Sequence, residues 1–354
     1  MRSIWRQKTG LLAGLVIGIL LGAGGLIFIS PPSGGGTTAT ITTAGSTTVY
    51  PLSQIWATYF PSDNPGLTLN PSPGGSGLGQ SLVSKGLIDI GASSAYPPQD
   101  YMDENPQVAV LPVSADALGI IVNEQVNGSI FKMDCDMAVA VFQRQITTWE
   151  DFASTFGVSV LQTGPINVYV RSDASGTTAT FAKWLETADL TNNSNGANYE
   201  WTLGHDEALS FPAGVNAVDG NPSVSSGVIA DDHGIGYVSL AFMKGAVPVD
   251  LFNPGNGQWI MPSVANAIKA IPSNLTSISQ EFMNSEISGA YPIARLLFYL
   301  VNQEYLRSYT ITFLSWCLLR GQNYVTEVGY IPINGTSVQQ YAFNALDTLV
   351  YNIT

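Results

Sequence analysis

Three short turns rich in glycine, serine and threonine are the parts of this chain best suited to bind a ligand. Each turn stands directly before a stretch in which apolar residues recur at helical spacing. Hydroxyls and unpaired backbone N–H groups at a helix start form a site for an anion, which the helix dipole also favours. One such turn alone is an ordinary helix cap. The three turns are Gly45-Ser46-Thr47-Thr48, Gly74-Gly75-Ser76-Gly77 and Arg171-Ser172-Asp173-Ala174-Ser175-Gly176-Thr177.

The third turn begins with an arginine, in a chain that has only five arginines after residue 30. A guanidinium offers two parallel N–H donors that match one edge of a tetrahedral oxyanion. Asp173 follows two residues after Arg171 and can hold the guanidinium in place. The alternative interpretation is a surface ion pair, which contributes little to stability. We therefore predict an oxyanion site centred on Arg171.

Most enzyme classes lack their usual residues here. The chain has two histidines, and no serine lies in a G-x-S-x-G motif. It has no Walker loop, and the GGSGLG stretch places Gln80 where a dinucleotide fingerprint needs its last glycine. Asp231, Asp232 and His233 are more typical of a solvated turn than of a metal site. We predict no catalysis, no metal and no cofactor.

Composition narrows the class of protein further. The 354 residues are enough for one large domain or two medium ones. Charged residues make up 11%, against about 25% in a typical soluble protein. The formal net charge is −13, so a nucleic-acid partner, which needs a basic surface, is not expected.

The N-terminal 30 residues differ from the rest of the chain. They contain three basic residues and no acidic one, and Leu11–Ile29 is almost entirely apolar. That length suffices to span a bilayer, and the basic end predicts a body on the outer side. We favour a retained membrane anchor, and a cleaved signal peptide is the alternative. Residues 31–40, which begin PPSGGG, are predicted to form a flexible tether.

Two further features concern an extracellular body. Cys135 and Cys317 do not form a disulfide framework, and Cys317 is predicted to be a small core residue of an apolar helix. N-x-S/T sequons predict a glycoprotein at the cell surface, although a chain rich in Asn and Thr acquires some by chance. They stand at Asn127, Asn192, Asn274, Asn334 and Asn352.

Short apolar strands alternate with helical stretches after the tether, which predicts an α/β fold. This pattern places the three turns between strands and helices. The expected strands are 40–43, 87–90, 118–122, 166–170, 237–242 and the apolar run 296–301. The expected helices are 51–60, 80–85, 137–142, 178–187 and 309–320.

The turns, taken in order, resemble the substrate-binding protein of ABC phosphate importers. AGSTTVYP resembles the first phosphate loop of that family, with Thr47 and Thr48 at ligand positions. GGSGLG places Ser76 at the serine of the second loop. IDIGASSAYP places Ser94 where the family usually has an aspartate that accepts the proton of phosphate.

VRSDASGTTATF is the strongest part of the resemblance. Arg171, Ser175, Gly176 and Thr177 fall on ligand positions, and Asp173 falls on the partner of the arginine. QITTWEDF, GIGYVSLAF and YPIAR match family landmarks. The resemblance extends from about residue 41 to residue 351.

The resemblance implies a type II periplasmic-binding-protein fold, in which two α/β lobes close over the ligand by a hinge. One lobe would comprise residues 41–112 plus about 290–354, and the other about 113–289. It also implies a monomeric, extracytoplasmic protein, anchored or secreted, that hands inorganic phosphate to an ABC permease. Three alternatives stay open: another tetrahedral oxyanion such as sulfate, arsenate, molybdate or tungstate; a glycosylated surface protein without a ligand; and a phosphoester hydrolase.

Overall fold

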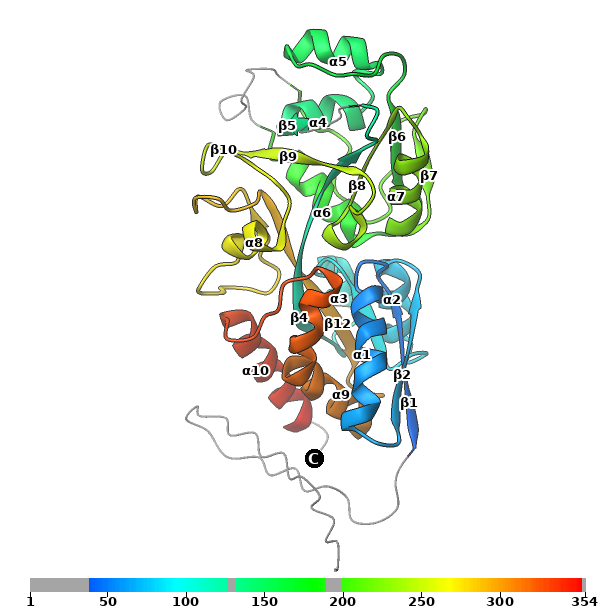
Figure 1. The fold of residues 1–354 in the computed structure, drawn as a ribbon. Coiled ribbons are helices and arrows are strands. Elements are labelled where there is room, and N and C mark those ends of the chain that lie inside the picture. Colours follow the sequence, from blue (N-terminus) through cyan, green and yellow to red (C-terminus); the bar gives the residue numbers. More distant parts are fainter. Residues whose placement is uncertain (1–37, 127–130, 189–198, 352–354) are drawn as a thin grey trace, which may run out of the picture. The chain divides into compact units, whose positions relative to one another are not determined.

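The computed structural model describes residues 38–126, 131–188 and 199–351 (Figure 1). From Thr38 onward the chain forms one compact unit. The predicted anchor, most of the tether and the sequons at Asn127, Asn192 and Asn352 lie outside the described residues. Within the described ranges, no helix has the length and apolar character needed to cross a bilayer.

A mixed sheet organises the described chain. Its strand order is β2 (Leu67–Pro73), β1 (Ala39–Gly45), β3 (Ile90–Ser93), β12 (Ile293–Asn302), β4 (Val108–Val122), β8 (Gly234–Ser239), β6 (Asn167–Arg171) and β7 (Asn216–Val218). Pairing is parallel among β2, β1 and β3, and again among β8, β6 and β7. The strands β12 and β4 between these two groups are antiparallel to their neighbours.

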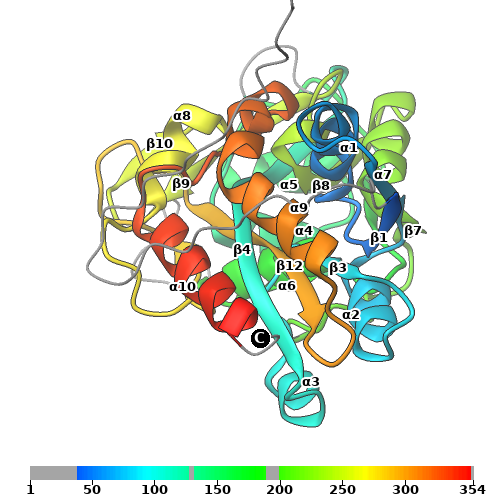
Figure 2. The ribbon, with the colours of Figure 1, turned by 90° about the horizontal axis from the view of Figure 1, so that it is seen from below.

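The long strand β4, together with β12, connects the two parallel groups. Its residues 108–117 pair with β12, which lies beside it in Figure 2, and residues 118–122 pair with β8. Nearly every residue of β4 is buried, as expected for a strand covered on both faces. The short strands β5 (Phe131–Met133), β9 (Val247–Asn253), β10 (Gln258–Ile260) and β11 (Phe282–Met283) extend the sheet. The division into two lobes stays a prediction.

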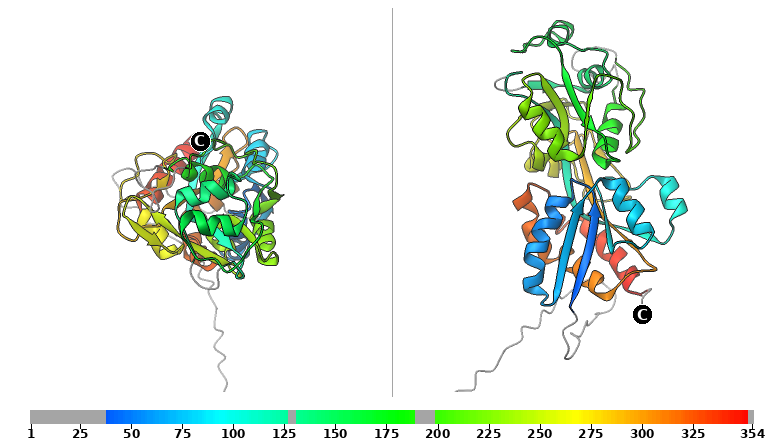
Figure 3. Two further views of the ribbon diagram at one scale, coloured as in Figure 1. Left: turned by 90° about the horizontal axis from the view of Figure 1, so that it is seen from above. Right: turned by 90° about the vertical axis from the view of Figure 1, so that its right-hand side faces the viewer.

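Helices begin just after the carboxyl ends of the parallel strands. β1 leads to α1 (Tyr50–Asp63), β2 to α2 (Ser76–Ser84), β6 to α6 (Gly176–Leu185) and β7 to α7 (Gly220–Ala230). Figure 3 shows α1 and α2 on opposite faces of β1 and β2. In open α/β sheets, ligands bind outside these carboxyl ends. The other helices are α3 (Gln99–Glu104), α4 (Cys135–Phe142), α5 (Trp149–Phe156), α8 (Val264–Ala267), α9 (Ser308–Leu318) and α10 (Ser337–Tyr351).

The bounds of several predicted strands differ from those in the structure. The strand expected from residue 87 begins only at Ile90, because Leu87 is exposed and the carboxylate of Asp89 binds the backbone N–H and the hydroxyl of Thr42. The strand expected to reach Phe242 ends at Ser239, and a 3-10 turn follows it. The other predicted elements are present, with ends shifted by a few residues or, for β4, by ten.

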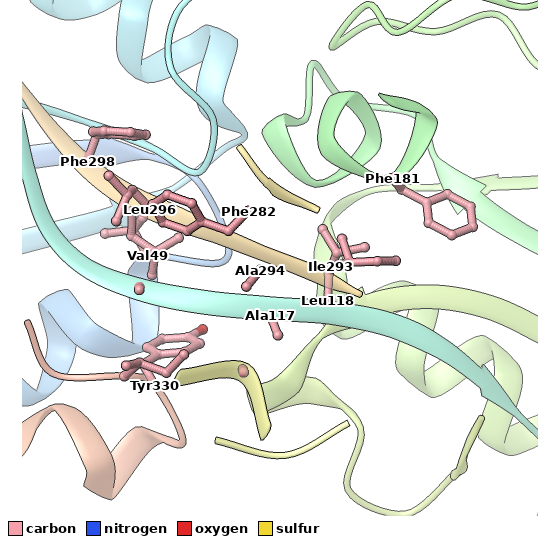
Figure 4. Packing of buried hydrophobic residues seen from close by; sticks show 14 of the residues in the cluster. Val49, Ala117, Leu118, Phe181, Phe282, Ile293, Ala294, Leu296, Phe298 and Tyr330 are labelled. Carbon is pink, nitrogen blue, oxygen red and sulfur yellow. The ribbon is translucent and has the colours of Figure 1, made fainter. Parts of the chain in front are cut away.

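The main core follows β4 and β12. Figure 4 shows Ala117 and Leu118 of β4 beside Ile293 and Ala294 of β12, with Phe181 of α6 nearby. Such close packing makes these strands a rigid support for the loops at their edges. Both cysteines are buried and free, so no disulfide joins them, and Cys317 is the core residue that the sequence predicts.

Candidate anion site

The first turn joins the end of β1 to helix α1, whose N-cap residue Val49 makes no side-chain capping bond. The hydroxyl oxygen of Ser46 accepts hydrogen bonds from the backbone N–H groups of Thr48 at 3.2 Å and Val49 at 3.4 Å. These two bonds hold the turn that precedes α1. Ser46, Thr47 and Thr48 are all buried.

The second turn brings α2 against the third turn. Gly75 has a φ of +86°, and a side chain there would place its Cβ 2.7 Å from a carboxylate oxygen of Asp173, so only glycine fits. The hydroxyl of Ser76 accepts from the backbone N–H groups of Ser94 at 3.2 Å and Gly176 at 3.3 Å. One serine therefore connects the second turn, the end of β3 and the start of α6.

The third turn caps α6 and touches the first turn. Ser175 accepts hydrogen bonds from the backbone N–H groups of Thr177 at 3.1 Å and Thr178 at 3.2 Å. The hydroxyl oxygens of Thr177 and Thr48 lie 3.0 Å apart. The structure thus places the hydroxyls of all three turns together.

Arg171 and Asp173 form a buried pair. The Nε of Arg171 donates to Asp173 Oδ1 at 2.6 Å, and its Nη2 donates to Oδ2. Only 2% of the arginine side chain is exposed, so the alternative of a surface ion pair is wrong. Burial disfavours ionisation of Asp173, but the hydrogen bond and charge of Arg171 outweigh it and lower the pKa of that carboxyl.

Ser94 lies inside the same cluster. Its side chain is buried, and its hydroxyl oxygen is 3.4 Å from that of Ser76. A Cβ on Gly176 would come within 2.8 Å of Ser94 Oγ, so this glycine allows the close approach of α6. All eight predicted ligand residues therefore lie in one cluster or directly beside it; their role as ligands stays a prediction.

Sequence reasoning missed a second buried arginine. Arg295, on β12, donates to Thr177 Oγ1 at 3.0 Å, to Thr48 Oγ1 at 3.3 Å and to the carbonyl of Gly176 at 3.0 Å. Asp116 on β4 accepts from its Nη2 at 3.0 Å and from its Nε at 3.3 Å. Burial raises the pKa of Asp116, against the pull of Arg295. Two signals could have drawn attention to it: the scarcity of arginine, and its place at the end of the YPIAR landmark.

Asn221, in the first turn of α7, was also missed. Its Nδ2 donates to Thr48 Oγ1 at 2.9 Å and to Thr47 Oγ1 at 3.3 Å. Its backbone N–H donates to Thr47 Oγ1 at 3.3 Å, and its Oδ1 accepts from the backbone N–H of Ser239 at 3.3 Å. No motif in the sequence marks this residue.

Glu207 is a third neighbour that the sequence did not reveal. Its carboxylate accepts from Gln80 Nε2 at 3.1 Å, and its carbonyl accepts from the backbone N–H of Ser175 at 2.9 Å. Burial raises the pKa of Glu207 to about 7, although Gln80, Arg171 and Lys183 act in the opposite direction. Glu207 therefore lies between α2 and the third turn as a readily protonated acid.

The cluster is rich in hydrogen-bond donors: hydroxyls, helix N-termini and two guanidinium groups. Such a set suits an oxyanion in a site shielded from water. Among the described residues, no group of three or more His, Cys, Asp or Glu side chains could hold a metal ion. Asp231 accepts hydrogen bonds from Asn167, Tyr169 and the backbone of His233, which accounts for that polar turn.

Removing single hydroxyls tests the ligand assignment. We expect Thr47→Ala and Ser175→Ala each to weaken oxyanion binding by about 1–2 kcal/mol, the usual contribution of a neutral hydrogen bond. Isothermal titration measures the change. Thr58→Ala, which removes an exposed hydroxyl from α1, is the control and should bind normally. Unchanged affinity in both site variants would contradict the assignment.

Comparison with known proteins assigns this chain to a family. Residues 30–320 match the family model for the PBP superfamily domain. The chain is 27% identical over 326 residues to the "Phosphate-binding protein PstS" of Xylella fastidiosa, covering 88% of this chain and 86% of that protein. A protein of the same name from Methanocaldococcus jannaschii is 26% identical, with 80% of each chain covered.

Solved structures share the fold. A "Putative Phosphate ABC Transporter Substrate-Binding Protein with Bound Phosphate" from Clostridium perfringens aligns with a TM-score of 0.63 at 17% identity, covering 84% of this chain and all of that one. The periplasmic phosphate-binding protein PfluDING aligns with a TM-score of 0.65 at 18% identity, covering 87% and 93%. These likenesses confirm the α/β type II periplasmic-binding-protein fold. With its family model matched over most of its length, the chain belongs to the PBP superfamily.

Proposed function

We propose that this protein captures inorganic phosphate outside the cytoplasm and delivers it to an ABC transporter. The observation that supports this most directly is the buried Arg171–Asp173 pair, which lies where the three turns at helix starts meet. The relatives named as phosphate-binding proteins agree with it. Thr47, Thr48, Ser76, Ser94, Arg171, Ser175, Gly176 and Thr177 would contact the anion.

The acidic chain does not prevent capture of an anion. Residues 31–354 carry 10 basic and 26 acidic groups, which repel phosphate at long range. Screening limits this repulsion beyond about 8–10 Å at physiological salt. Buried hydroxyls, N–H groups and guanidinium groups act at contact distance in a low dielectric and outweigh it. Salt dependence of binding should therefore be mild.

A thermal-shift panel of oxyanions tests the proposal. A ligand that binds only the folded state raises stability by RT ln(1 + [L]/Kd). We expect phosphate to raise the melting temperature more than sulfate, molybdate or tungstate does. No shift with any oxyanion would overturn the function. Turnover of a generic phosphomonoester would show an enzyme instead of a binding protein.

The remaining parts of the proposal concern the whole protein. The two predicted lobes would close over phosphate by a hinge through β4 and β12. Residues 1–30 would anchor a monomeric body at the cell surface, with signal-peptide cleavage as the alternative. Asn274 and Asn334 are exposed, so both sequons in the described ranges are open to glycosylation.

Removal of the N-terminal segment tests the anchor. A protein that begins at residue 36 should be soluble and bind phosphate with unchanged affinity, because the site is built from residues 46 onward. Membrane fractionation of the full chain is the companion measurement. Native protein recovered from the medium, with its mature N-terminus after residue 23, would show a cleaved signal instead.

Ser94 favours a second candidate, in which the same site also takes sulfate. A serine hydroxyl both donates and accepts. An aspartate at this position would be an unpaired buried charge beside sulfate, because sulfate has no proton to give. The resulting repulsion would make the site select phosphate over sulfate. We expect Ser94→Asp to increase rejection of sulfate relative to phosphate at least about tenfold at neutral pH, from a cost of about 1–3 kcal/mol. Competition titrations decide this. If wild type already excludes sulfate by many orders of magnitude, Ser94 is not the discriminating residue.

A further inference from the structure

One acid beside the candidate site, Glu207, connects the two predicted lobes. Its carboxylate accepts from Gln80 Nε2 at 3.1 Å, and its backbone carbonyl accepts from the N–H of Ser175 at 2.9 Å. Next to it, the backbone N–H of Gly77 donates to the carbonyl of Ala174 at 3.2 Å. Gly77 and Gln80 belong to α2 in the predicted first lobe, whereas the other three residues belong to the predicted second lobe. Glu207 therefore lies at the boundary that has to open when the lobes separate.

Two carboxylates lie against the turn of α2 that carries Ser76. A Cβ on Gly75 would come within 2.7 Å of a carboxylate oxygen of Asp173, and one on Gly77 would lie 3.6 Å from Glu207 Oε2. When Glu207 is ionised, it is a second negative charge beside this turn. The hydroxyl of the same turn is a predicted ligand of the anion, so the charge of Glu207 bears on anion binding.

The cations that face Glu207 are already paired with other carboxylates. Arg171, in the third turn, binds Asp173, and Lys183, on α6, binds Glu281. Both cations favour the ionised form of Glu207, while Asp173 opposes it. Burial outweighs the two cations and raises the pKa of Glu207 to about 7. The acid therefore changes its charge in the neutral pH range.

The other neighbours of Glu207 lie on α2 and on its own segment. Helix α2 faces it with the neutral amide of Gln80. On its own segment, His205 turns towards Glu186, with 2.8 Å between His205 Nδ1 and Glu186 Oε1, and Asp206 is exposed. The protonation state of Glu207 thus depends mainly on its burial and on the charge of what binds beside it.

Capture of an anion changes both of these conditions in the same direction. Closure of the predicted lobes removes the carboxylate of Glu207 from water. A bound oxyanion brings negative charge to the turn of α2 that Glu207 contacts. Each change disfavours the ionised carboxylate, so the protonated acid is the form that suits the closed, occupied site.

We propose that Glu207 couples phosphate capture to the uptake of a proton from the solvent. The carboxylate is protonated as the lobes close over the anion, and it returns this proton to the solvent when they open. The inference rests on the proposed phosphate-capture function and adds its regulation by pH. By linkage, the contribution of Glu207 to phosphate affinity grows as pH falls through the range in which this acid titrates.

Glu207→Gln tests the coupling, because the amide keeps the shape of the side chain and is neutral at every pH. The measurement is the ratio of the Kd values for phosphate at pH 8 and pH 6, obtained by isothermal titration. Phosphate itself titrates in this range, but it does so equally for both proteins. We expect the ratio of wild type to exceed that of Glu207→Gln by about three- to tenfold, since tenfold corresponds to one pKa unit. Titrations in two buffers with different heats of ionisation should show more proton uptake by wild type.

Two further variants make the test specific. Glu150→Gln is the matched control, because Glu150 is an exposed acid on α5 that accepts from the backbone N–H of Gly164, and its ratio should equal that of wild type. Gln80→Leu removes the amide that stabilises ionised Glu207. The midpoint of the pH dependence should then move to higher pH, which a merely structural role of Glu207 would not cause.

The outcomes separate the coupling from the proposed function. Equal ratios in wild type and folded Glu207→Gln, or a lowered ratio in Glu150→Gln as well, overturn the coupling and leave phosphate capture standing. If Glu207→Gln does not fold, an unchanged midpoint in Gln80→Leu overturns it. Wild-type protein that binds no phosphate at either pH overturns the proposed function itself.

Discussion

Arg171→Ala is expected to weaken phosphate binding by about 2–5 kcal/mol, which is roughly a 30-fold to several-thousand-fold rise in Kd. The guanidinium is buried at the meeting point of the three turns and would supply the charge-assisted donors to the anion. Removal of these donors also leaves Asp173 as a buried negative charge without its cation. Isothermal titration with phosphate measures the loss, and chemical denaturation verifies the fold.

Two companion variants separate these contributions. Arg320→Ala removes an arginine that pairs with Asp63 on the surface, so it should bind phosphate normally. In Arg171→Ala/Asp173→Ala, the buried carboxylate is removed together with its partner. Partial recovery of affinity in this double variant would show how much of the loss is repulsion by Asp173. Near-normal affinity in Arg171→Ala itself would mean that the site assignment is wrong.

The parts of the candidate site that lie close together in the sequence could be predicted from local chemistry. A serine or threonine before a helical stretch indicates a helix start, so Ser46, Ser76 and Ser175 could be placed at helix starts from sequence alone. Arg171 and Asp173 are two residues apart, so their pairing was a local inference too.

Long-range contacts set the limit of that reasoning. Arg295 meets Thr48 across 247 positions, and Asn221 meets it across 173. No periodicity or motif encodes these distances, because the register of β12 and the packing of α7 determine them. The same limit explains the strand ends at residues 90 and 239, where side-chain hydrogen bonds and exposure override strand propensity.

Glu207 supplies the second large effect, on stability against pH. The pKa of this acid in the folded protein is about 7, well above its ordinary value of 4.5, because burial disfavours the charged form. When folding raises the pKa of an acid, its protonated form favours the folded state, and this contribution is lost as the acid ionises. The free energy of unfolding should therefore be highest near pH 4.5, fall as pH rises towards 7 and level off above it.

The size of the fall follows from the shift in pKa. A shift of one pKa unit corresponds to about 1.36 kcal/mol of stability. Because Glu207 is partly exposed, the loss should be smaller than this conversion of its whole pKa shift. We expect a loss of about 1–3 kcal/mol between pH 4.5 and 8, measured by urea denaturation. Asp173 acts in the opposite sense. Its pKa is lowered by folding, so it stabilises the folded protein while it is ionised, and this contribution is lost as the pH falls into the acidic range.

Glu207→Gln should remove most of this pH dependence. The amide oxygen can still accept from Gln80, while the charge that burial opposes is gone. The variant should match wild type near pH 4.5 and exceed it in stability at pH 8. Glu281→Gln is the control, because Glu281 is partly exposed and pairs with Lys183, and its curve should keep the wild-type slope. Parallel curves for wild type and Glu207→Gln would show that Glu207 is ionised and solvated in the folded protein, and that the fall in stability has another source.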